Sequence, residues 1–167
     1  AAGLSLAMLS AGCGGDSAGS AVTDGGVIRV PQDATTIQKA VDRAGDGTLV
    51  LISPGTYRES VKVPIGHPPF VIRGAERNAV VLEGDNQLEN GIDIQANGVS
   101  GENLTIQNYL VNGLLFAPPS LAQGKEPLLG YRASYVTAVN NGLYGIYAFG
   151  SRGGLFEHLY ASGSPDS

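Results

Sequence analysis

Four carboxylates lie close together in the sequence and form the densest group of side chains that could do chemistry: Glu83, Asp85, Glu89 and Asp93. Oxygen ligands at this density suit a hard cation such as calcium. The spacing matches neither an EF-hand loop nor a glycine-rich calcium repeat, and a solvated acidic turn is the competing interpretation. We therefore expect no resident cofactor and no metal site, with calcium at this turn as the alternative.

Histidine and cysteine are scarce, because the chain has only two histidines and one cysteine. A single cysteine excludes an internal disulfide, and three such side chains are too few for a closed zinc site. His67 lies in a Gly-His-Pro-Pro turn. The repeat described below aligns His158 with Leu104 and Val136, in a column expected to face inward. We interpret both histidines as turn or core residues rather than members of a catalytic triad.

The remaining signal for ligand binding is aromatic, since nine of the eleven Tyr and Phe side chains fall between Tyr109 and Tyr160. Strand alternation is expected to turn Tyr135, Tyr147 and Glu157 outward, with Tyr135 and Glu157 in one stacked column. Exposed tyrosine rings beside a carboxylate suit the apolar faces and hydroxyls of sugars. The alternative is that an insertion at residues 117–130 folds over these rings and buries them.

The composition favours one all-β domain. The chain has 167 residues, enough for one sizeable core, and its 25 glycines argue against a helical bundle. Fifteen acidic residues against ten basic residues give a net charge of −5. A phosphate backbone or an anionic lipid surface would be repelled, so we expect no nucleic-acid partner.

One segment of the chain has the pattern of a helix. The stretch TTIQKAVDRAGDG, beginning at Thr35, predicts a helix over residues 36–44, with Thr35 and Gln38 as a capping box and Gly45 in the left-handed position after the helix. The residues that follow form short β-branched runs broken by glycine and proline, which is typical of short strands.

A repeat indicates how these strands are arranged. The motif GIDI at residues 91–94 recurs as GLLF at 113–116 and as GIYA at 145–148. The residue number rises by 22 from the first copy to the second and by 32 from the second to the third, and the extra length falls within 117–130. A period near 22 with several short strands per repeat predicts a parallel β-helix, in which each coil stacks on the previous one.

The opening segment VPQDATTIQKAVDRAGDGTLVLISPGTYRESVKV resembles the first coil of the right-handed parallel β-helix repeat family, with the pectin-lyase-like architecture. The resemblance covers about residues 27–167 and implies coils of about 22 residues with an N-terminal capping α-helix. Asn108 and Asn140 align and resemble an asparagine ladder at a turn. The counterpart of Ile146 in the next coil would lie just beyond Ser167, so we expect the sequence to stop in mid-repeat.

The segments GTYRESVKV and NLTIQN also resemble stretches of pectinesterases. That family has a catalytic glutamine, two aspartates and an arginine in motifs that would follow soon after NLTIQN. This chain continues as YLVNGLLFAPPS and has no aspartate between Asp93 and Asp166, so the catalytic aspartates cannot be carried over. A pectinesterase mechanism is disfavoured, and an enzyme of this architecture would be a polysaccharide lyase or a glycoside hydrolase.

The N-terminus resembles the end of a bacterial lipoprotein signal peptide. Residues 1–13 are uncharged and end in LSAGC, which resembles a lipobox with Cys13 as the lipidated residue, although Ser10 replaces the usual leucine. We expect the sequence to begin partway through this signal peptide. An ordinary cysteine in a floppy N-terminus is the alternative. Residues 14–26 have the composition of a flexible linker, and residues 27–167 form the β-helix domain.

These features together predict an extracytoplasmic monomer, secreted or anchored to the cell surface, that contacts the membrane only through a lipid on Cys13. We expect it to bind a polysaccharide, and the sequence leaves open whether it also processes one. The alternative from another class is a non-catalytic adhesin or structural surface protein.

The lipid anchor predicts a change in membrane association for the Cys13→Ala variant. A single site of acylation holds the parent protein at the membrane, so the variant is expected to move from the membrane fraction to the soluble fraction. Cell fractionation with immunoblotting measures this change. Equal membrane association of parent and variant would contradict the anchor.

Overall fold

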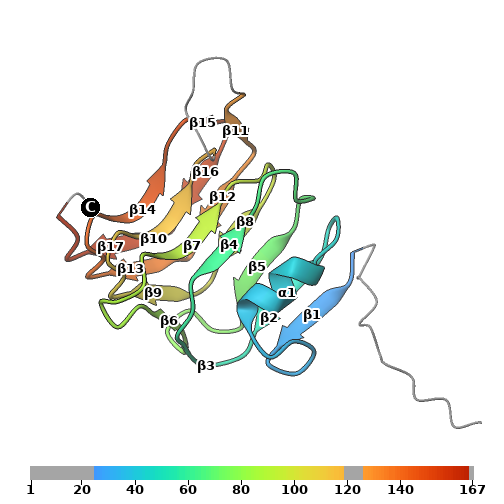
Figure 1. Cartoon of the computed structure of the whole chain (residues 1–167), viewed down its shortest axis with the longest axis horizontal. Coiled ribbons are helices and arrows are strands. Elements are labelled where there is room, and N and C mark those ends of the chain that lie inside the picture. Colours follow the sequence, from blue (N-terminus) through green and yellow to red (C-terminus); the bar gives the residue numbers. More distant parts are fainter. Residues whose placement is uncertain (1–24, 119–125, 166–167) are drawn as a thin grey trace, which may run out of the picture.

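The structure is a computed structural model that describes residues 25–118 and 126–165, and it is built almost entirely of short parallel strands (Figure 1). Sheet A contains β1 (Val27–Val30), β2 (Leu49–Ile52), β5 (Val71–Gly74), β8 (Ser100–Glu102), β12 (Arg132–Ser134) and β16 (Leu155–Glu157). Sheet B contains β3 (Gly55–Tyr57), β6 (Val80–Glu83), β9 (Thr105–Gln107), β13 (Thr137–Val139) and β17 (Tyr160–Ser162). Sheet C contains β4 (Val61–Val63), β7 (Asn90–Ile94), β10 (Asn112–Phe116) and β14 (Tyr144–Ala148).

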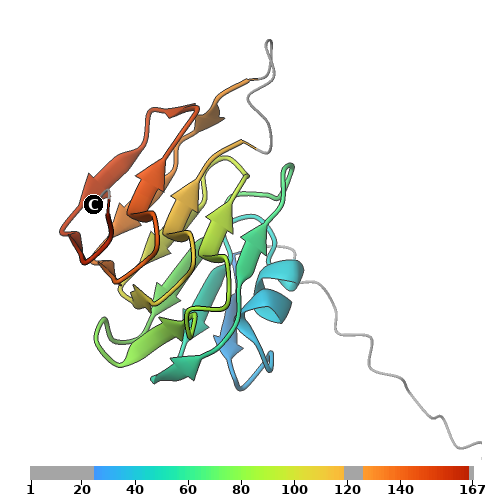
Figure 2. The same cartoon turned by 60° about the vertical axis from the view of Figure 1, so that its left-hand side comes forward.

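The chain visits the three sheets in the order A, B, C and then moves one strand along the stack. Figure 2 shows the result, in which successive coils are stacked from blue to red. A further pair, β11 (Leu128–Leu129) with β15 (Ser151–Arg152), lies outside the three sheets. The predicted fold, a right-handed parallel β-helix with one short N-terminal helix, is confirmed.

Side chains that alternate along the strands fill the interior in columns. In sheet C, Ile92, Leu114 and Ile146 occupy equivalent positions on neighbouring strands, as the repeat predicts. Ile92 and Leu114 are fully buried, whereas Ile146 near the last coil is only partly buried. Each buried aliphatic side chain contributes about 1.5–3 kcal/mol relative to an exposed one, so these columns stabilise the stack of coils.

The coils differ in length, and the differences fall at the turns. The first coils are short, and Val27 pairs with Leu49. The coil that carries the insertion is the longest, and it brings Arg132 beside Ser100. In the last coil Arg132 pairs with Leu155, whereas the repeat predicts residue 154 as its partner. This coil is thus longer than the repeat by a single residue, which shifts the final strands by one position relative to the sequence-based alignment.

The predicted helix is present as α1 (Ile37–Arg43), but its ends differ from the expected ones. The N-cap is Thr36, whose hydroxyl accepts the backbone N–H of Lys39, so the predicted capping box of Thr35 and Gln38 is wrong. The helix ends because Ala44 is extended, with φ −67° and ψ 131°. The prediction of a left-handed Gly45 is therefore wrong, because the chain is already extended at Ala44 and Gly45 does not have a positive φ.

Glu59 and Gln38 attach the helix to the second coil. The carboxylate of Glu59 accepts the backbone N–H groups of Ile37 (3.0 Å) and Gln38 (2.9 Å), which have no partner within the helix. The side-chain amide of Gln38 donates to the backbone oxygen of Lys62 (3.0 Å) and accepts the backbone N–H of Lys62 (2.6 Å). The amide thus occupies the place of a neighbouring strand beside β4.

The asparagine ladder forms at a different position from the predicted one. Asn108 and Asn140 both adopt left-handed turns, with φ of 59° and 54°. The side chain of Asn108, however, donates to the carboxylate of Glu83. The amide contact between coils is made instead by Asn112, whose Nδ2 donates to Oδ1 of Asn90 (2.8 Å).

Residues 1–24, which include Cys13 and most of the predicted linker, lie outside the described residues. In the part of the chain that is described, no helix is long and apolar enough to cross a membrane.

The role of Glu59 at the helix N-terminus predicts a loss of stability in the Glu59→Ala variant. Hydrogen bonds from two otherwise unpaired N–H groups to a charged acceptor are worth about 1–3 kcal/mol. We expect a decrease of this size in the free energy of unfolding, measured by urea denaturation. Glu76→Ala, which removes an exposed carboxylate, serves as the control. Equal destabilisation of both variants would show that Glu59 does not cap the helix.

Candidate functional site

The outer face of sheet C carries a continuous row of outward side chains, one from each strand. Strand pairing places Lys62, Asp93, Leu115 and Tyr147 at equivalent positions on β4, β7, β10 and β14. These strands lie side by side in Figure 1. We call this surface, together with the rings and the hollow described next, the sheet C face. It has an aromatic end at β14 and a charged end at β4.

Three aromatic rings form the aromatic end. The rings of Tyr144 and Tyr147 are stacked, with centroids 4.1 Å apart and planes 14° apart. Phe149 continues the row, 5.7 Å from Tyr147 and at 16° to it. The side chain of Phe149 is 46% exposed. Near-parallel rings in a row present apolar edges and faces beside tyrosine hydroxyls, which is the surface that a sugar ring can contact.

A hollow of ≈200 Å³ forms the charged end. Its walls come from the loop before β4, from β4 itself and from the start of β7, and its lining residues are Ser60, Val61, Lys62, Glu89, Asn90 and Asp93. The hollow therefore combines two carboxyl groups, one ammonium, one amide and one hydroxyl. Such a mixture of donors and acceptors can orient a hydroxyl-rich ligand.

Asp93 is the most perturbed of these side chains. Burial raises the pKa of its carboxyl, although a hydrogen bond from Gln95 and the charge of Lys62 act in the opposite direction. The Nε2 of Gln95 donates to Oδ2 (2.8 Å), whereas the buried Oδ1 has no hydrogen-bond partner. A carboxyl with a raised pKa keeps its proton at higher pH, as a general acid must.

The four carboxylates of the alternative calcium site do not come together. Glu83 accepts hydrogen bonds from the side chains of Gln107 and Asn108, and Asp85 pairs with Arg58 (2.7 Å). Glu89 and Asp93 face the hollow on sheet C instead. Among the described residues, no group of three or more His, Cys, Asp or Glu side chains is placed to hold a metal ion. The turn directs its carboxylates to different partners.

Of the three residues predicted to bind sugar, only Tyr147 lies on the sheet C face. Tyr135 lies at the turn between β12 and β13, with φ of 54° and an exposed fraction of 47%. Its ring stacks on His158, with centroids 4.5 Å apart and planes 16° apart. The placement of His158 in an inward column is therefore wrong, as is the pairing of Tyr135 with Glu157. Both errors follow from the added residue in the last coil.

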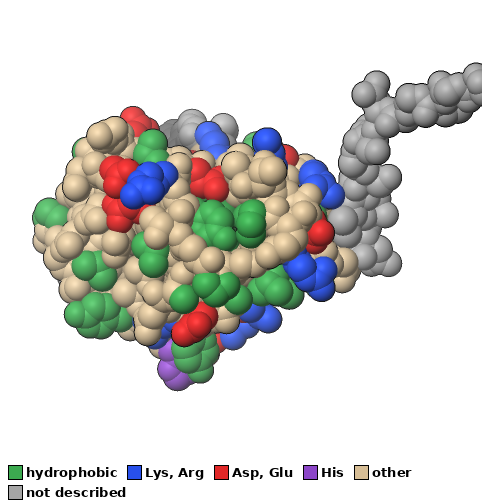
Figure 3. Space-filling view, turned by 90° about the horizontal axis from the view of Figure 1, so that it is seen from below, with side chains coloured by type: hydrophobic (Ala, Val, Ile, Leu, Met, Phe, Trp, Pro, Cys, Tyr) green, Lys and Arg blue, Asp and Glu red, His purple; other side chains and the backbone are tan. Residues whose placement is uncertain are grey.

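Glu157 belongs to a ladder of charges on the outer face of sheet A. Arg73 donates to Glu102, whose side chain is 7% exposed, and Arg132 bridges Glu102 (3.2 Å) to Glu157. The carboxylate of Glu157 is thus occupied by Arg132. Figure 3, which views the molecule from below Figure 1, likewise shows acidic and basic side chains next to one another. The ladder links side chains of successive coils.

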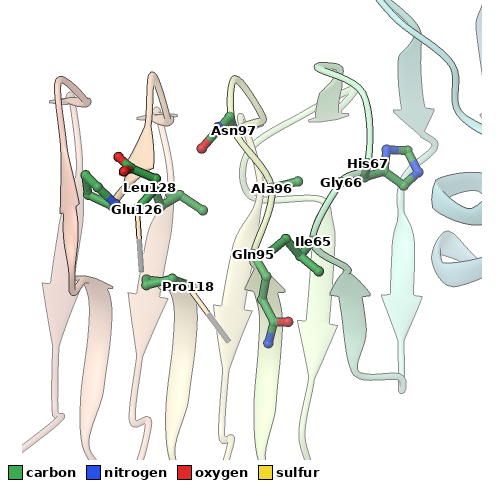
Figure 4. A pocket seen from close by; sticks show the side chains of 10 residues that line it. Ile65, Gly66, His67, Gln95, Ala96, Asn97, Pro118, Glu126 and Leu128 are labelled. Carbon is green, nitrogen blue, oxygen red and sulfur yellow. The ribbon is translucent and has the colours of Figure 1, made fainter. Parts of the chain in front are cut away.

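The insertion forms the wall of another hollow, where the chain turns from sheet C to sheet A. This hollow of ≈170 Å³ lies among the turns of successive coils (Figure 4), and its lining includes His67, Gln95, Pro118, Glu126 and Leu128. The insertion therefore lines a hollow, and Tyr135, Tyr147 and Glu157 are not part of it. The residues at 119–125 lie outside the described part of the chain.

Both nitrogens of the His67 ring lie against backbone oxygens, those of Pro68 (3.1 Å) and Val41 (3.0 Å). The ring also packs against Phe70. These contacts agree with the prediction that His67 is a turn residue and not a member of a catalytic triad, because neither ring nitrogen is left to activate a nucleophile.

Comparison with known proteins supports the fold. No protein-family model matches the chain, and no curated protein matches it. Among solved structures, the chain is similar to a crystal structure of a pectin methylesterase mutant in complex with a hexasaccharide, with a TM-score of 0.52 and 16% sequence identity. The match covers 83% of this chain and 49% of the other, so this chain spans about half the length of that protein. The similarity shows the fold alone, a parallel β-helix.

Sequence analysis missed the partners of Tyr147 and the hollow at β4 and β7. The spacing of Tyr144, Tyr147 and Phe149 was the available signal for the row of rings. Strict alternation would place Tyr144 and Tyr147 on opposite faces, yet their rings stack. A Cβ on Gly145 would approach the Cβ atoms of Ala138 and Ala161 to 3.1–3.2 Å, in the interior. Gly145 therefore faces the interior, and the next residue, Ile146, packs against the core as well. Two successive inward residues mean that the alternation breaks at the glycine.

The pKa of Glu83 is lowered and the pKa of Asp93 is raised, so pH is expected to change their contributions to stability in opposite directions. Burial raises the pKa of Glu83, but hydrogen bonds from Gln107, the Asp85 backbone and Asn108 outweigh it, and the net pKa is lowered. Glu83 therefore stabilises the fold above its ordinary pKa, and this contribution is lost as the pH falls through its folded-state pKa. For Asp93, whose pKa is raised, the ionised form costs stability once the pH rises through its folded-state pKa.

We expect Glu83→Gln to lower the free energy of unfolding by about 1–3 kcal/mol at neutral pH, and to have little effect in acid. Asp93→Asn is expected to be at least as stable as the parent at neutral pH, and its advantage should shrink in acid. Urea denaturation over a pH series measures both differences. A loss of stability at neutral pH in Asp93→Asn as large as in Glu83→Gln would contradict this assignment.

Proposed function

We propose that the protein binds a polysaccharide on the sheet C face, with the polymer running across the strands, parallel to the axis of the β-helix. The observation that carries this proposal is the row from the stacked rings of Tyr144 and Tyr147 to the polar hollow beside Asp93. Aromatic rings contact the apolar faces of sugars, and the hollow offers hydrogen bonds to their hydroxyls.

The dimensions of the face suit an extended polymer. Neighbouring strands lie about 4.8 Å apart, so the row from Lys62 to Tyr147 extends over about 14 Å. A ligand of this length contacts all four strands of sheet C at once. Because the strands are held by their ladders of hydrogen bonds, the contacts are already in place before the ligand binds.

The similar pectin methylesterase provides independent support, since its structure contains a bound hexasaccharide. A pectin-lyase-like β-helix is thus a scaffold on which an oligosaccharide can bind. The residues proposed here come from this chain alone, because the sequence identity is too low to transfer a binding site. On the sheet C face, the positions next to Asp93 in the row are Lys62 and Leu115, so the row does not supply a second aspartate.

We also propose an extracytoplasmic location, with Cys13 as the lipid anchor and residues 14–26 as the tether. The proposal is supported by the uncharged N-terminal run that ends in LSAGC. A tethered module outside the cytoplasm would meet surface or environmental polysaccharides.

The aromatic end predicts a loss of glycan binding in the Tyr147→Ala variant. Removing the central ring of the row eliminates stacking worth about 0.5–1.5 kcal/mol, so we expect the dissociation constant to rise by about threefold to tenfold. A glycan array identifies the ligand, and calorimetry with that glycan measures the change.

Tyr160→Ala is the matched control, because Tyr160 is an exposed tyrosine (57%) on sheet B. Thermal melting of each variant verifies that it is folded. Unchanged binding in Tyr147→Ala, or equal losses in both variants, would reject the sheet C face as the binding site.

A further inference from the structure

The hollow at the charged end of the sheet C face has an unbalanced charge. Glu89 and Asp93 contribute two negative charges and Lys62 contributes one positive charge. The other polar side chains in its lining, Ser60 and Asn90, are uncharged. Within the described residues, Lys62 forms no ion pair with either carboxylate, and both carboxylates are without an ion-pair partner. A ligand in this hollow would therefore meet an excess of negative charge.

The hydrogen bonding of Asp93 leaves this charge incompletely compensated. Gln95 donates to one carboxylate oxygen, and the other oxygen is buried without a partner. Buried carboxylates are otherwise stabilised by several donors or by a cation. Glu83 shows the contrast in the same chain, because it accepts hydrogen bonds from Gln107, Asn108 and the Asp85 backbone. A positively charged group in the hollow would therefore stabilise the ionised carboxylate of Asp93.

The side chains that line the hollow fit an ammonium group better than a calcium ion. Calcium takes six to eight oxygen ligands, and this lining falls short of that shell because Oδ1 of Asn90 already accepts from Asn112 and Oδ2 of Asp93 already accepts from Gln95. Lys62 beside the carboxylates would also repel a divalent ion more strongly than a single ammonium. An ammonium group needs only a few acceptors, which the carboxylate of Glu89 and the hydroxyl of Ser60 offer beside Asp93.

We propose that the hollow is a subsite for an amino sugar, so that the polysaccharide bound on the sheet C face contains free hexosamine units with protonated amines. This inference rests on the proposed function, since it assigns the class of sugar at one end of the same face. It excludes polyuronates as preferred ligands, because their carboxylates would lie against Glu89 and Asp93. N-acetylated polymers lack the positive charge and so gain no ionic attraction from the two carboxylates.

The test compares three oligosaccharides with the full chain by calorimetry. The probes are a glucosamine hexamer, the fully N-acetylated hexamer and a galacturonate hexamer, at a pH where the amines are protonated. We expect the glucosamine hexamer to bind about tenfold more tightly than the acetylated one, the factor expected from one charge-assisted contact. The preference should decrease at high salt, because the hollow is open to solvent.

Variants assign the preference to the hollow. Glu89→Gln and Asp93→Asn keep the shapes of the side chains, and each is expected to remove most of the tenfold preference, measured within each variant as the ratio of the dissociation constants of the acetylated and glucosamine hexamers. Glu76→Gln removes an exposed carboxylate outside the sheet C face and is expected to leave the preference intact. Glu89 is exposed, so its variant tests the charge without disturbing a buried residue.

The outcomes separate this inference from the proposed function. Equal binding of the glucosamine and acetylated hexamers, both weakened by Tyr147→Ala, would overturn the amino-sugar subsite and keep the polysaccharide face. Tighter binding of galacturonate would overturn the subsite in the same way. If the preference for glucosamine persists in both Glu89→Gln and Asp93→Asn, the ligand ammonium binds outside the hollow. This result would also overturn the amino-sugar subsite. Failure of all the glycans on an array and all three probes to bind would reject the proposed function together with the inference.

Discussion

The whole molecule depends on the hydrogen bonds between parallel strands of successive coils. Each strand is only two to five residues long and cannot be stable alone, so its backbone groups must find partners in the coil before and the coil after. This requirement places equivalent residues one strand spacing apart and generates the inward columns. Extra residues can be accommodated only at turns, and the insertion between β10 and β12 follows this rule.

The same constraint arranges the candidate site. Because outward positions also stack in register, Lys62, Asp93, Leu115 and Tyr147 form a straight row, although each comes from a different coil and they are far apart in the sequence. The backbone fixes the positions in this row. The side chains at these positions can therefore differ from one coil to the next without affecting the core. Sheet A uses its outer face differently, since Arg73, Glu102 and Arg132 neutralise one another there.

The parts of the fold predictable from sequence were those in which apolar residues recur. The alignment of Ile92 with Leu114 and Ile146 was correct because these positions share the constraint of the interior. The alignment failed at the last coil, where one added residue places His158 beside Tyr135 and leaves Glu157 paired with Ser134. Exposed positions carry no apolar signal that would reveal such a shift. For the same reason, closeness in sequence was misleading for the acidic turn, where Glu83 and Asp93 face different partners.

The contact between Gln38 and Lys62 determines how other molecules can approach the first strand of sheet C. An exposed edge strand offers free N–H and C=O groups, and many peptide-binding domains recognise a ligand by adding it as a further strand. At Lys62 these backbone groups are already engaged by the amide of Gln38, one donating and one accepting. Strand addition is therefore blocked at the edge of the sheet nearest the hollow. Recognition beside β4 has to rely on side chains, which distinguish the functional groups of a ligand, rather than on the backbone, which would accept any extended peptide.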